Sequence, residues 1–318
     1  VGVHTAGASN GLSGNYSLLR YNADGTLDTS FGGGDGKITF DPSFGLGHDS
    51  LGEIELDANG KILVSGYIRN GSSYAVGIAR FNADGSIDTS FGGGDGVTVT
   101  PVGTFEHGTR LTQQSDGKIL VAGNLNGNYG VVRYNTDGSL DTTFGSGAGY
   151  VTIDGAGSSD YSRDIQIDSN GKIVIAGYSL SGGFREFGIV RLNANGSVDT
   201  SFGGGDGVTI SSIGTGNDYA YGVIPQSNGS YIVGGLTYNG TSFDFVLARY
   251  TSTGTLDTSF GGGDGIIITP TNTIDPNITD TSLVKFYNYS LTQQSDGKVI
   301  AVGNGTATSP ATGTATQP

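Results

Sequence analysis

Short apolar runs alternate with glycine-rich turns along almost the whole chain. In one representative stretch, Ile54 and Leu56 alternate with Glu53 and Glu55, which is the period-2 pattern of a half-buried strand. Asn-Gly, Asp-Gly and Gly-Gly dipeptides, which favour tight turns, bound the runs. No long stretch has the 3.6-residue period of a helix. The pattern predicts four strands here, A to D, at Gly52–Leu56, Lys61–Gly66, Tyr74–Phe81 and Val97–Thr100.

The same pattern repeats. The phrase Asp-Thr-Ser-Phe-Gly, or its variant Asp-Thr-Thr-Phe-Gly, begins at Asp28, Asp88, Asp141, Asp199 and Asp257, at spacings of 60, 53, 58 and 58 residues. A second phrase, Asn/Asp-Gly-Lys followed by an apolar run, precedes most copies. Four short strands repeated at a fixed period are typical of propeller blades. We therefore predict an all-β protein, a β-propeller of four-stranded antiparallel blades with about five blades, or six or more if the chain is an excerpt.

The full motif runs from Asp-Gly-Lys-Ile-Leu-Val-Ala-Gly through Arg-Tyr/Phe-Asn-Ala-Asp-Gly-Ser to Leu/Ile-Asp-Thr-Ser-Phe-Gly-Gly-Gly-Asp-Gly. This combination resembles the delta-60 repeat family, up to about Asn304. The resemblance implies a bacterial propeller repeat in a secreted or cell-surface setting, and it implies no catalytic residues. We expect one propeller over 1–304, followed by a Thr/Ala/Pro-rich linker or tail over 305–318.

The sequence predicts 21 strands in all, which is one more than five four-stranded blades need. The surplus is a second B strand, since both Val1–Gly7 and Lys298–Gly303 match that strand. Propellers close without an unpaired seam when one blade combines strands from both chain ends. We expect such mixed closure, in which the C-terminal A strand joins the N-terminal C and D strands and the two B candidates compete for one place. The spare strand is then a tether or pairs with another subunit. The sign of mixed closure or exchange is pairing of the segment after Lys298 with the strand around Ser17–Tyr21. The alternative is that Val1–Gly7 pairs there and the copy at Lys298 begins a separate blade.

One arginine occurs in every C strand, and an aspartate follows eight residues later in every unit. A charge in an apolar strand must be paired, because burying it alone is costly. We favour a structural ion pair that fixes the C–D connection over a binding role. The Phe of each phrase is interpreted as an apolar plug between blades. The pairs are Arg20–Asp28, Arg80–Asp88, Arg133–Asp141, Arg191–Asp199 and Arg249–Asp257.

Acids recur at the start of four A strands: Asp49, Glu106, Asp160 and Asp218. Because strand A is innermost in a propeller, these side chains belong at one mouth of the central channel. Two interpretations stay open: a carboxylate ring that binds a cation or polar ligand, and local capping of neighbouring loops, which we favour. The Gly-Gly-Gly-Asp-Gly phrase lacks the nine-residue period of calcium-binding repeats. We expect no cofactor and no dedicated metal site, and we leave a bound cation such as calcium open.

The two faces of the propeller differ in sequence. The A–B turns and C–D phrases, which lie on one face, are almost identical between units, whereas the B–C and D–A loops of the other face vary. This varied face carries aromatic and small polar residues, a mixture typical of binding surfaces. The expected ligand-binding residues are the four acids together with Tyr74, Tyr129 and Tyr238. Loop tolerance alone is the competing explanation.

The amino-acid composition excludes several classes of binding partner. The formal net charge of -14 disfavours nucleic acid and anionic membranes, which both need a positive patch. The chain has no Cys, which excludes disulfides and thiolate chemistry, and no apolar stretch long enough for membrane insertion. Glycans, cell-surface proteins and copies of the chain itself remain as expected partners.

Three functions are therefore in competition. The first is an extracellular or cell-surface ligand-binding or adhesion module. The second is a structural subunit of an extracellular assembly or filament. The third, which we favour least, is a propeller glycosidase or lyase using an acid pair. We expect no enzyme, because the chain offers only three His, four Glu and no recognised nucleophile or zinc motif.

Overall fold

The structure is a computed structural model that describes residues 2–6, 14–40, 50–70, 73–157, 159–240, 242–270 and 290–302. This part of the chain is all-β, and its one helical element is a single 3-10 turn at Gly145–Gly147. It contains 21 strands, as the repeat count predicts. Among the same residues, no helix has the length and apolarity that crossing a bilayer requires.

Four sheets within the described ranges have four antiparallel strands each, in chain order. Their strands are β4–β7 (Ser50–Leu56, Ile62–Asn70, Ser73–Phe81, Val97–Thr100), β8–β11 (Phe105–Gln113, Ile119–Leu125, Asn128–Tyr134, Tyr150–Ile153), β12–β15 (Asp160–Ile167, Ile173–Ser181, Phe184–Leu192, Val208–Ser211) and β16–β19 (Asp218–Pro225, Tyr231–Tyr238, Phe243–Tyr250, Ile266–Thr269). Two smaller sheets are β1–β3 (Gly2–Ala6, Gly14–Leu19, Lys37–Phe40) and β20–β21 (Ser290–Gln293, Val299–Val302).

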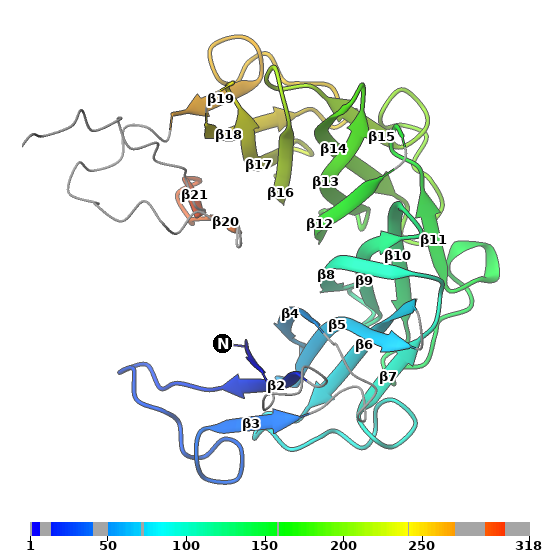
Figure 1. Cartoon of the computed structure of the whole chain (residues 1–318), viewed down its shortest axis with the longest axis vertical. Helices are drawn as coiled ribbons and strands as arrows, with labels where there is room; N and C mark the ends of the chain where they lie inside the picture. The colour runs from blue at the N-terminus through cyan, green and yellow to red at the C-terminus, as the bar shows by residue number, and fades with distance from the viewer. Residues whose placement is uncertain are drawn as a thin grey trace, which may run out of the picture.

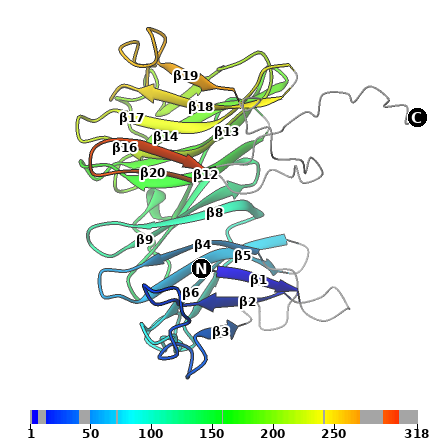
Figure 2. The ribbon, with the colours of Figure 1, turned by 90° about the vertical axis from the view of Figure 1, so that its left-hand side faces the viewer.

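The sheets follow one another around an arc, as the blades of a propeller do (Figure 1). The first strand of each four-stranded sheet lies innermost, and the last strand lies at the outer rim. Figure 2 looks onto the inner strands β4, β8, β12 and β16, with β20 beside β16. The predicted β-propeller of about five blades is confirmed, and the strands of the representative unit lie where the pattern places them.

The expected mixed closure is wrong. β1 pairs with β2, from Gly2–Leu18 to Ala6–Gly14, while β20 and β21 form a separate two-stranded sheet. The B-strand position beside β2 is therefore filled from the N-terminal side. A pairing across a few residues costs much less loop-closure entropy than one across the whole chain, which explains the choice between two similar strands.

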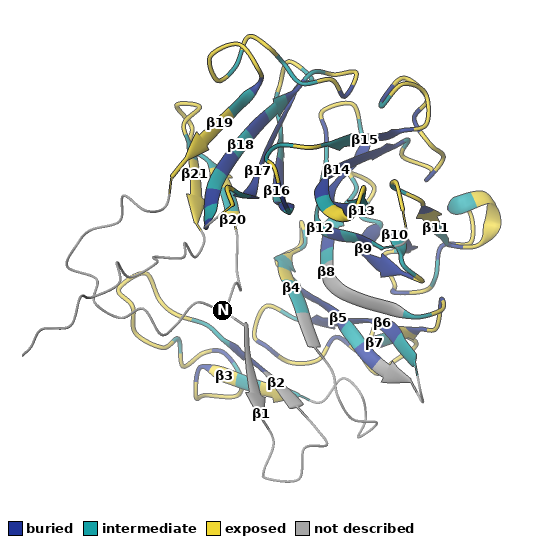
Figure 3. Ribbon diagram, turned by 45° about the horizontal axis from the view of Figure 1, so that its top comes forward, coloured by how far each residue is buried: buried dark blue, intermediate teal, exposed yellow. Residues whose placement is uncertain are grey.

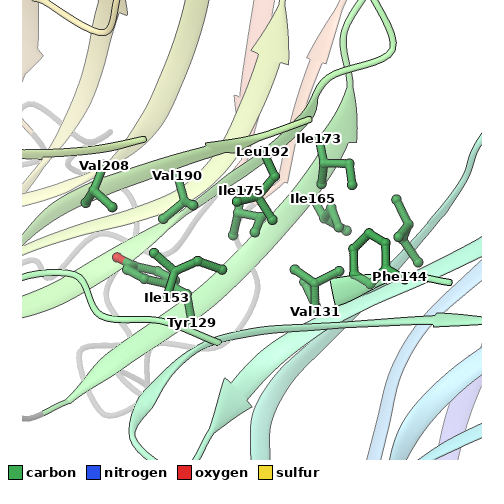
Figure 4. Close-up of a cluster of buried hydrophobic side chains, with 12 residues drawn as sticks. Tyr129, Val131, Phe144, Ile153, Ile165, Ile173, Ile175, Val190, Leu192 and Val208 are labelled. Carbon is green, nitrogen blue, oxygen red and sulfur yellow. The ribbon is translucent and has the colours of Figure 1, made fainter. Parts of the chain in front are cut away.

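Apolar side chains fill the space between neighbouring sheets, so most strands of the central sheets are buried on both faces (Figure 3). Figure 4 shows one such core, where Tyr129, Val131 and Phe144 face Ile165 and Ile175 of the next sheet. The phrase phenylalanines lie in these cores, as expected of plugs between blades. Phe31, Phe91, Phe144 and Phe202 are at most 1% exposed.

All five expected Arg–Asp pairs form, with the arginine Nε donating to the aspartate Oδ2 at 2.6–2.8 Å. The side chains of the Arg133–Asp141 pair are only 8% and 3% exposed, whereas those of the Arg249–Asp257 pair are 26% and 22% exposed. Each guanidinium also stacks over the phrase phenylalanine of its own unit, with Arg133 lying 4.5 Å from the Phe144 ring centroid.

The three interior pairs have a third member that the sequence interpretation missed. Lys61 Nζ lies 2.6 Å from Asp88 Oδ2, and Lys118 and Lys172 contact Asp141 and Asp199 in the same way. Burial would raise the pKa of Asp88, but hydrogen bonds from Lys61, Ser90 and Arg80 outweigh it and hold that pKa well below its usual range. The lysine belongs to the recurring Asn/Asp-Gly-Lys phrase, so its spacing was the available signal.

The arginine also connects its unit to the next. Arg133 Nη1 donates to the backbone oxygen of Ala194 at 2.6 Å, and the Gly145 N–H donates to Asn195 at 3.3 Å. These acceptors belong to the turn after the next C strand. The Asp-Thr-Ser/Thr-Phe-Gly phrase is thus a connector between blades, and its repetition follows from its repeated structural task.

Candidate functional site

Asp160 and Asp218, two of the four acids expected around the channel mouth, are fully buried at 0% exposure. They begin β12 and β16, as expected. Asp160 Oδ2 accepts a hydrogen bond from the Gly155 N–H at 2.7 Å, and Asp218 Oδ2 accepts from Ile213 and Gly214 at 2.7 and 3.0 Å. These carboxylates tie the D–A loops to the strands. For this pair the capping interpretation fits, and an open carboxylate ring does not.

The other two acids give no geometry for a cation site. Asp49 lies outside the described residues, and the Glu106 side chain also lies outside them although its backbone belongs to β8. Across the ranges that the structure describes, no three His, Asp or Glu side chains cluster closely enough to hold a metal ion. Cation binding therefore stays a prediction.

Tyr129 lies in a different environment from the one expected of a ligand-binding residue. Its side chain is 0% exposed, and its hydroxyl hydrogen-bonds with Ser179 of the next sheet at 3.0 Å. Burial raises its pKa far above the ordinary value. Because alternate residues of a strand share a face, Tyr129 points with Val131 into the core between blades. It is a packing residue and we withdraw it from the binding surface.

Tyr74 and Tyr238 are half-buried and lie near B–C hairpins, as expected of the varied face. Tyr74 packs edge-on against Tyr67 with ring centroids 5.2 Å apart. Tyr238 contacts the Phe243 ring at 5.1 Å and donates its hydroxyl to the Gly240 backbone oxygen. Tyr74 and Tyr238 therefore both remain candidates for ligand binding.

Two residues that the sequence interpretation missed occupy β-bulges in neighbouring inner strands. The register of β12 shifts between Ser162 and Asp164, which leaves Arg163 as the extra residue. In β16 the shift falls at the corresponding position and leaves Tyr221 extra. β4 has a register shift at the corresponding place, between Leu51 and Glu53, so the bulge belongs to the repeat. Its effect in β12 and β16 is to re-aim the side chains of Arg163 and Tyr221. Because the alternation of apolar and polar residues does not reveal a bulge, these two residues escaped prediction.

Around the bulges lies an aromatic–arginine patch made of Tyr161, Arg163, Tyr178, Arg185, Tyr219 and Tyr221. Tyr178 contacts Tyr161 at 4.9 Å and Tyr219 at 5.0 Å between ring centroids. Arg163 lies 5.3 Å from the Tyr178 centroid, and Arg185 lies 5.6 Å from that of Tyr219. Tyr178 is buried and the other five are half-buried, so the patch has partly accessible rings.

The arginines of the patch are only partly satisfied. Arg163 Nη2 donates to the Tyr178 hydroxyl at 2.8 Å, but its buried Nε has no hydrogen-bond partner among the described residues. Arg185 Nη1 reaches the Tyr219 hydroxyl at 3.3 Å. Buried polar groups are normally paired, so this unpaired donor of Arg163 is an exception within the patch.

A cavity of about 320 Å³ adjoins the patch at the centre of the arc. Its lining combines charges of both signs from the inner strands: Glu53, Arg110, Arg163, Asp164, Tyr221 and Leu291. Arg110 donates to the Arg163 and Gly52 backbone oxygens, both at 2.9 Å, which holds the inner strands together. Burial raises the pKa values of Glu53 and Asp164. The size and mixed polarity suit a small polar ligand or one end of a larger one.

Two cavities are larger than this one, and they lie at equivalent positions in two repeat units. One of about 660 Å³ runs along β7 beside Asp137–Leu140, and one of about 440 Å³ occupies the equivalent place beside Asn195–Ser197. Both are lined by glycine loops of the connector phrase. Because they recur with the repeat, we assign them to the architecture and not to ligand binding.

A buried carboxyl pair lies close to the patch. The Glu186 side chain on β14 neighbours Asp218 on β16, and burial together with the charge of Asp218 raises the pKa of Glu186 to about 7. One oxygen of each group, Glu186 Oε2 and Asp218 Oδ1, is buried without a partner in the described part. Burial and the neighbouring charge thus both favour the protonated form of Glu186.

Tandem four-stranded sheets, joined by a repeated connector, define a repeat β-propeller. The chain belongs to the family described as Domain of unknown function (DUF5122) beta-propeller, whose model matches residues 6–31, 58–91, 114–144, 169–202 and 226–260. The five matched segments each end in the connector phrase, consistent with the delta-60-like repeat inferred from the motif. No curated protein sequence matches the chain.

Solved structures resemble the chain only distantly. A hypothetical protein from Leishmania major has 14% identity and a TM-score of 0.38, covering 79% of this chain and 80% of its own. A mannose phosphorylase from Leishmania mexicana has 12% identity and a TM-score of 0.35, with 80% and 79% covered. Virginiamycin B lyase from Staphylococcus aureus has 14% identity and a TM-score of 0.30, with 65% and 83% covered. At these values the likenesses carry no argument about activity.

Proposed function

We propose that this protein is an extracellular or cell-surface propeller that binds a saccharide through the aromatic–arginine patch. The observation that carries the proposal is the patch itself: four tyrosines and two arginines gathered at one place on the varied face. Rigid aromatic rings give contact area at low entropic cost, and arginine supplies several fixed donors. Sugars present apolar ring faces and many acceptor oxygens, so their chemistry matches both components.

The contrast between the two faces supports the proposal. On the repeated face, polar groups are consumed by their own turns: Asp84 Oδ1 accepts from both the Ser86 N–H and its hydroxyl, and Asp24 does the same with Thr26. A surface satisfied in this way offers little to a ligand. The extracellular setting rests on the resemblance of the repeat to secreted and surface proteins.

The test is a glycan array probed with the full chain, followed by titration of the bound saccharides. Tyr219→Ala should weaken binding at least about tenfold, which corresponds to losing roughly 1.4 kcal/mol at a contact residue. Arg185→Ala should act mainly on acidic saccharides, since it removes charge and leaves the rings. Tyr21, 50% exposed on the repeated face, provides the matched control, and Tyr21→Ala should bind normally.

Two results would oppose the proposal. If the protein binds no saccharide specifically on the array, saccharides are not its ligands. Equal loss of binding in Tyr219→Ala and Tyr21→Ala would place the contact elsewhere or indicate non-specific adhesion.

A further inference from the structure

Ion pairing separates the basic side chains at the patch and the cavity from all the others that the structure describes. Ten Lys and Arg side chains have a nitrogen 2.6–3.9 Å from an aspartate oxygen. The other described Lys and Arg side chains make no such contact with a described carboxylate, and they are Arg110, Arg163 and Arg185. The chain has 29 Asp and Glu residues and a net charge of -14, so carboxylates are abundant elsewhere.

Arg110 has other partners within the chain. Its Nε and Nη1 both donate to backbone oxygens of neighbouring inner strands. Burial raises the pKa values of Glu53 and Asp164, and the positive charge of Arg110 acts against that rise at both carboxyls. Arg110 is therefore compensated by two acids across the cavity, which leaves Arg163 and Arg185 as the exceptions.

Stacking on aromatic rings does not replace an ion pair in this protein. Each of the five C-strand arginines stacks over a phenylalanine at 4.5–4.8 Å and still donates to an aspartate. Arg163 lies 5.3 Å from the Tyr178 centroid and Arg185 lies 5.6 Å from that of Tyr219, which are longer contacts. The tyrosines therefore do not account for the missing counter-ion of the two arginines.

The two positive charges act at one place on the patch. The guanidinium carbons of Arg163 and Arg185 lie 5.3 and 5.8 Å from the centroid of the same ring, that of Tyr178. Burial raises the pKa of Tyr221 to about 12, and the charges of both arginines act to lower it. One terminal nitrogen of each arginine donates to a tyrosine hydroxyl, and the other terminal nitrogen has no acceptor among the described residues.

We propose that the saccharide bound at the patch is acidic, and that its carboxylate or sulfate group is the counter-ion of Arg163 and Arg185. This inference rests on the proposed saccharide binding and names the class of saccharide. Guanidinium groups match the oxygens of such anions with paired hydrogen bonds. The partly accessible rings of the patch then contact the apolar face of the sugar. Because the net charge of the chain repels long polyanions, the ligand is a short saccharide with few acidic groups.

The glycan array tests this inference when it carries neutral, carboxylated and sulfated saccharides together. The full chain should bind acidic saccharides. Converting the carboxylate of a bound saccharide to its methyl ester, or removing its sulfate, should weaken binding at least about tenfold, because charge-assisted hydrogen bonds are lost. The two conversions also show which of the two anions the protein recognises.

Substitutions then test whether Arg163 and Arg185 contact the acidic group. The measured quantity is the ratio of affinities for an acidic saccharide and its neutralised form. Arg163→Gln and Arg185→Gln should each lower this ratio at least about fivefold, with little change for the neutral form. Arg185→Lys keeps the charge and should retain part of the ratio. Arg249→Gln is the matched control, since Arg249 is already paired with Asp257, and it should leave the ratio unchanged.

The outcomes separate this inference from saccharide binding itself. Neutral saccharides that bind as tightly as their acidic counterparts would overturn the inference and leave saccharide binding intact. An array without any bound saccharide would overturn the proposed function, and the inference with it. A ratio that falls equally in Arg249→Gln, or that stays at the wild-type value in both Arg163→Gln and Arg185→Gln, would show that these two arginines do not bind the acidic group.

Discussion

Gly138 lies directly against the ring of Phe91, so that a Cβ at this glycine would come within 2.8 Å of the ring carbons. The lack of a side chain at Gly138 makes room for the phenylalanine of the preceding unit. The equivalent Gly25 has the same backbone conformation, with φ of 86° against 85°, but faces open space. The two glycines therefore separate the free-energy cost of a left-handed backbone from the cost of blocking the contact between neighbouring units.

We predict that Gly25→Ala lowers the free energy of unfolding by about 1 kcal/mol, the cost of a left-handed alanine. Gly138→Ala should lower it by about 1–3 kcal/mol more, because the added methyl overpacks against Phe91. Urea unfolding of dilute protein measures both. Equal losses for the two variants would contradict the role assigned to the contact between Gly138 and Phe91.

Arg133 and Arg249 make the same ion pair in different surroundings. Arg133→Ala removes charged hydrogen bonds to Asp141 and to the Ala194 backbone oxygen and leaves the buried Asp141 with Lys118 as its remaining cation. It should cost about 3–5 kcal/mol, without changing ligand binding at temperatures where the fold survives. Arg249→Ala removes a more exposed pair and should cost about 1 kcal/mol or less. Thermal and urea unfolding compare the variants. A loss below about 0.5 kcal/mol for Arg133→Ala would refute a buried structural role.

Tyr129→Phe tests the conclusion that Tyr129 is a packing residue and does not contact the ligand. The change removes the buried hydrogen bond to Ser179 and should cost about 1 kcal/mol of unfolding free energy. Saccharide binding should stay at the wild-type level, since Tyr129 is 0% exposed. Calorimetric titration together with urea unfolding measures both properties. Weakened binding with unchanged stability would return Tyr129 to the ligand site.

The buried carboxyls make stability depend on pH. Glu186 and Glu55 have pKa values of about 7, above the ordinary 4.5, with burial as the first cause. The folded state therefore keeps protons that the unfolded chain releases, and this contribution is complete below about pH 4.5 and lost as pH rises through 7. We expect the free energy of unfolding to fall by about 1–3 kcal/mol per group between pH 5 and pH 8.

Glu186→Gln should flatten part of this pH dependence, because the amide donates to Asp218 without titrating. Glu55→Gln, at a carboxyl whose pKa is raised by burial and by Glu53, should remove a separate part. Urea unfolding across this pH range provides the comparison. A wild-type profile that rises or stays level from pH 5 to pH 8 would show that these carboxyls are ionised at little cost.

The fold follows from local features, which is why the sequence predicts it so fully. Turn dipeptides and short alternating runs mark each strand, and the repeat multiplies the signal. Closure was mispredicted because Val1–Gly7 and Lys298–Gly303 are nearly equivalent as B strands, and only chain connectivity separates them. Local pattern contains no information on which of two similar strands lies nearer to β2.

The candidate site was predicted only in part. The positions of Asp160 and Asp218 at the starts of inner strands were right, but their direction depends on loop N–H groups such as that of Gly155, which spacing does not specify. Arg163 and Tyr221 depend on bulges, which shift a side chain by one residue and leave no mark in the alternation. The varied face was identified from loop variety, whereas its chemistry required the structure.

Amide hydrogen exchange of the full chain, with and without its bound saccharide, tests the central claim most directly. Binding at the aromatic–arginine patch predicts slower exchange at 160–164, 178–185 and 218–222, with the connector segments at 141–149, 199–207 and 257–265 unchanged. Protection confined to the connector segments, with the patch unaffected, would contradict the assignment of the varied face as the binding surface.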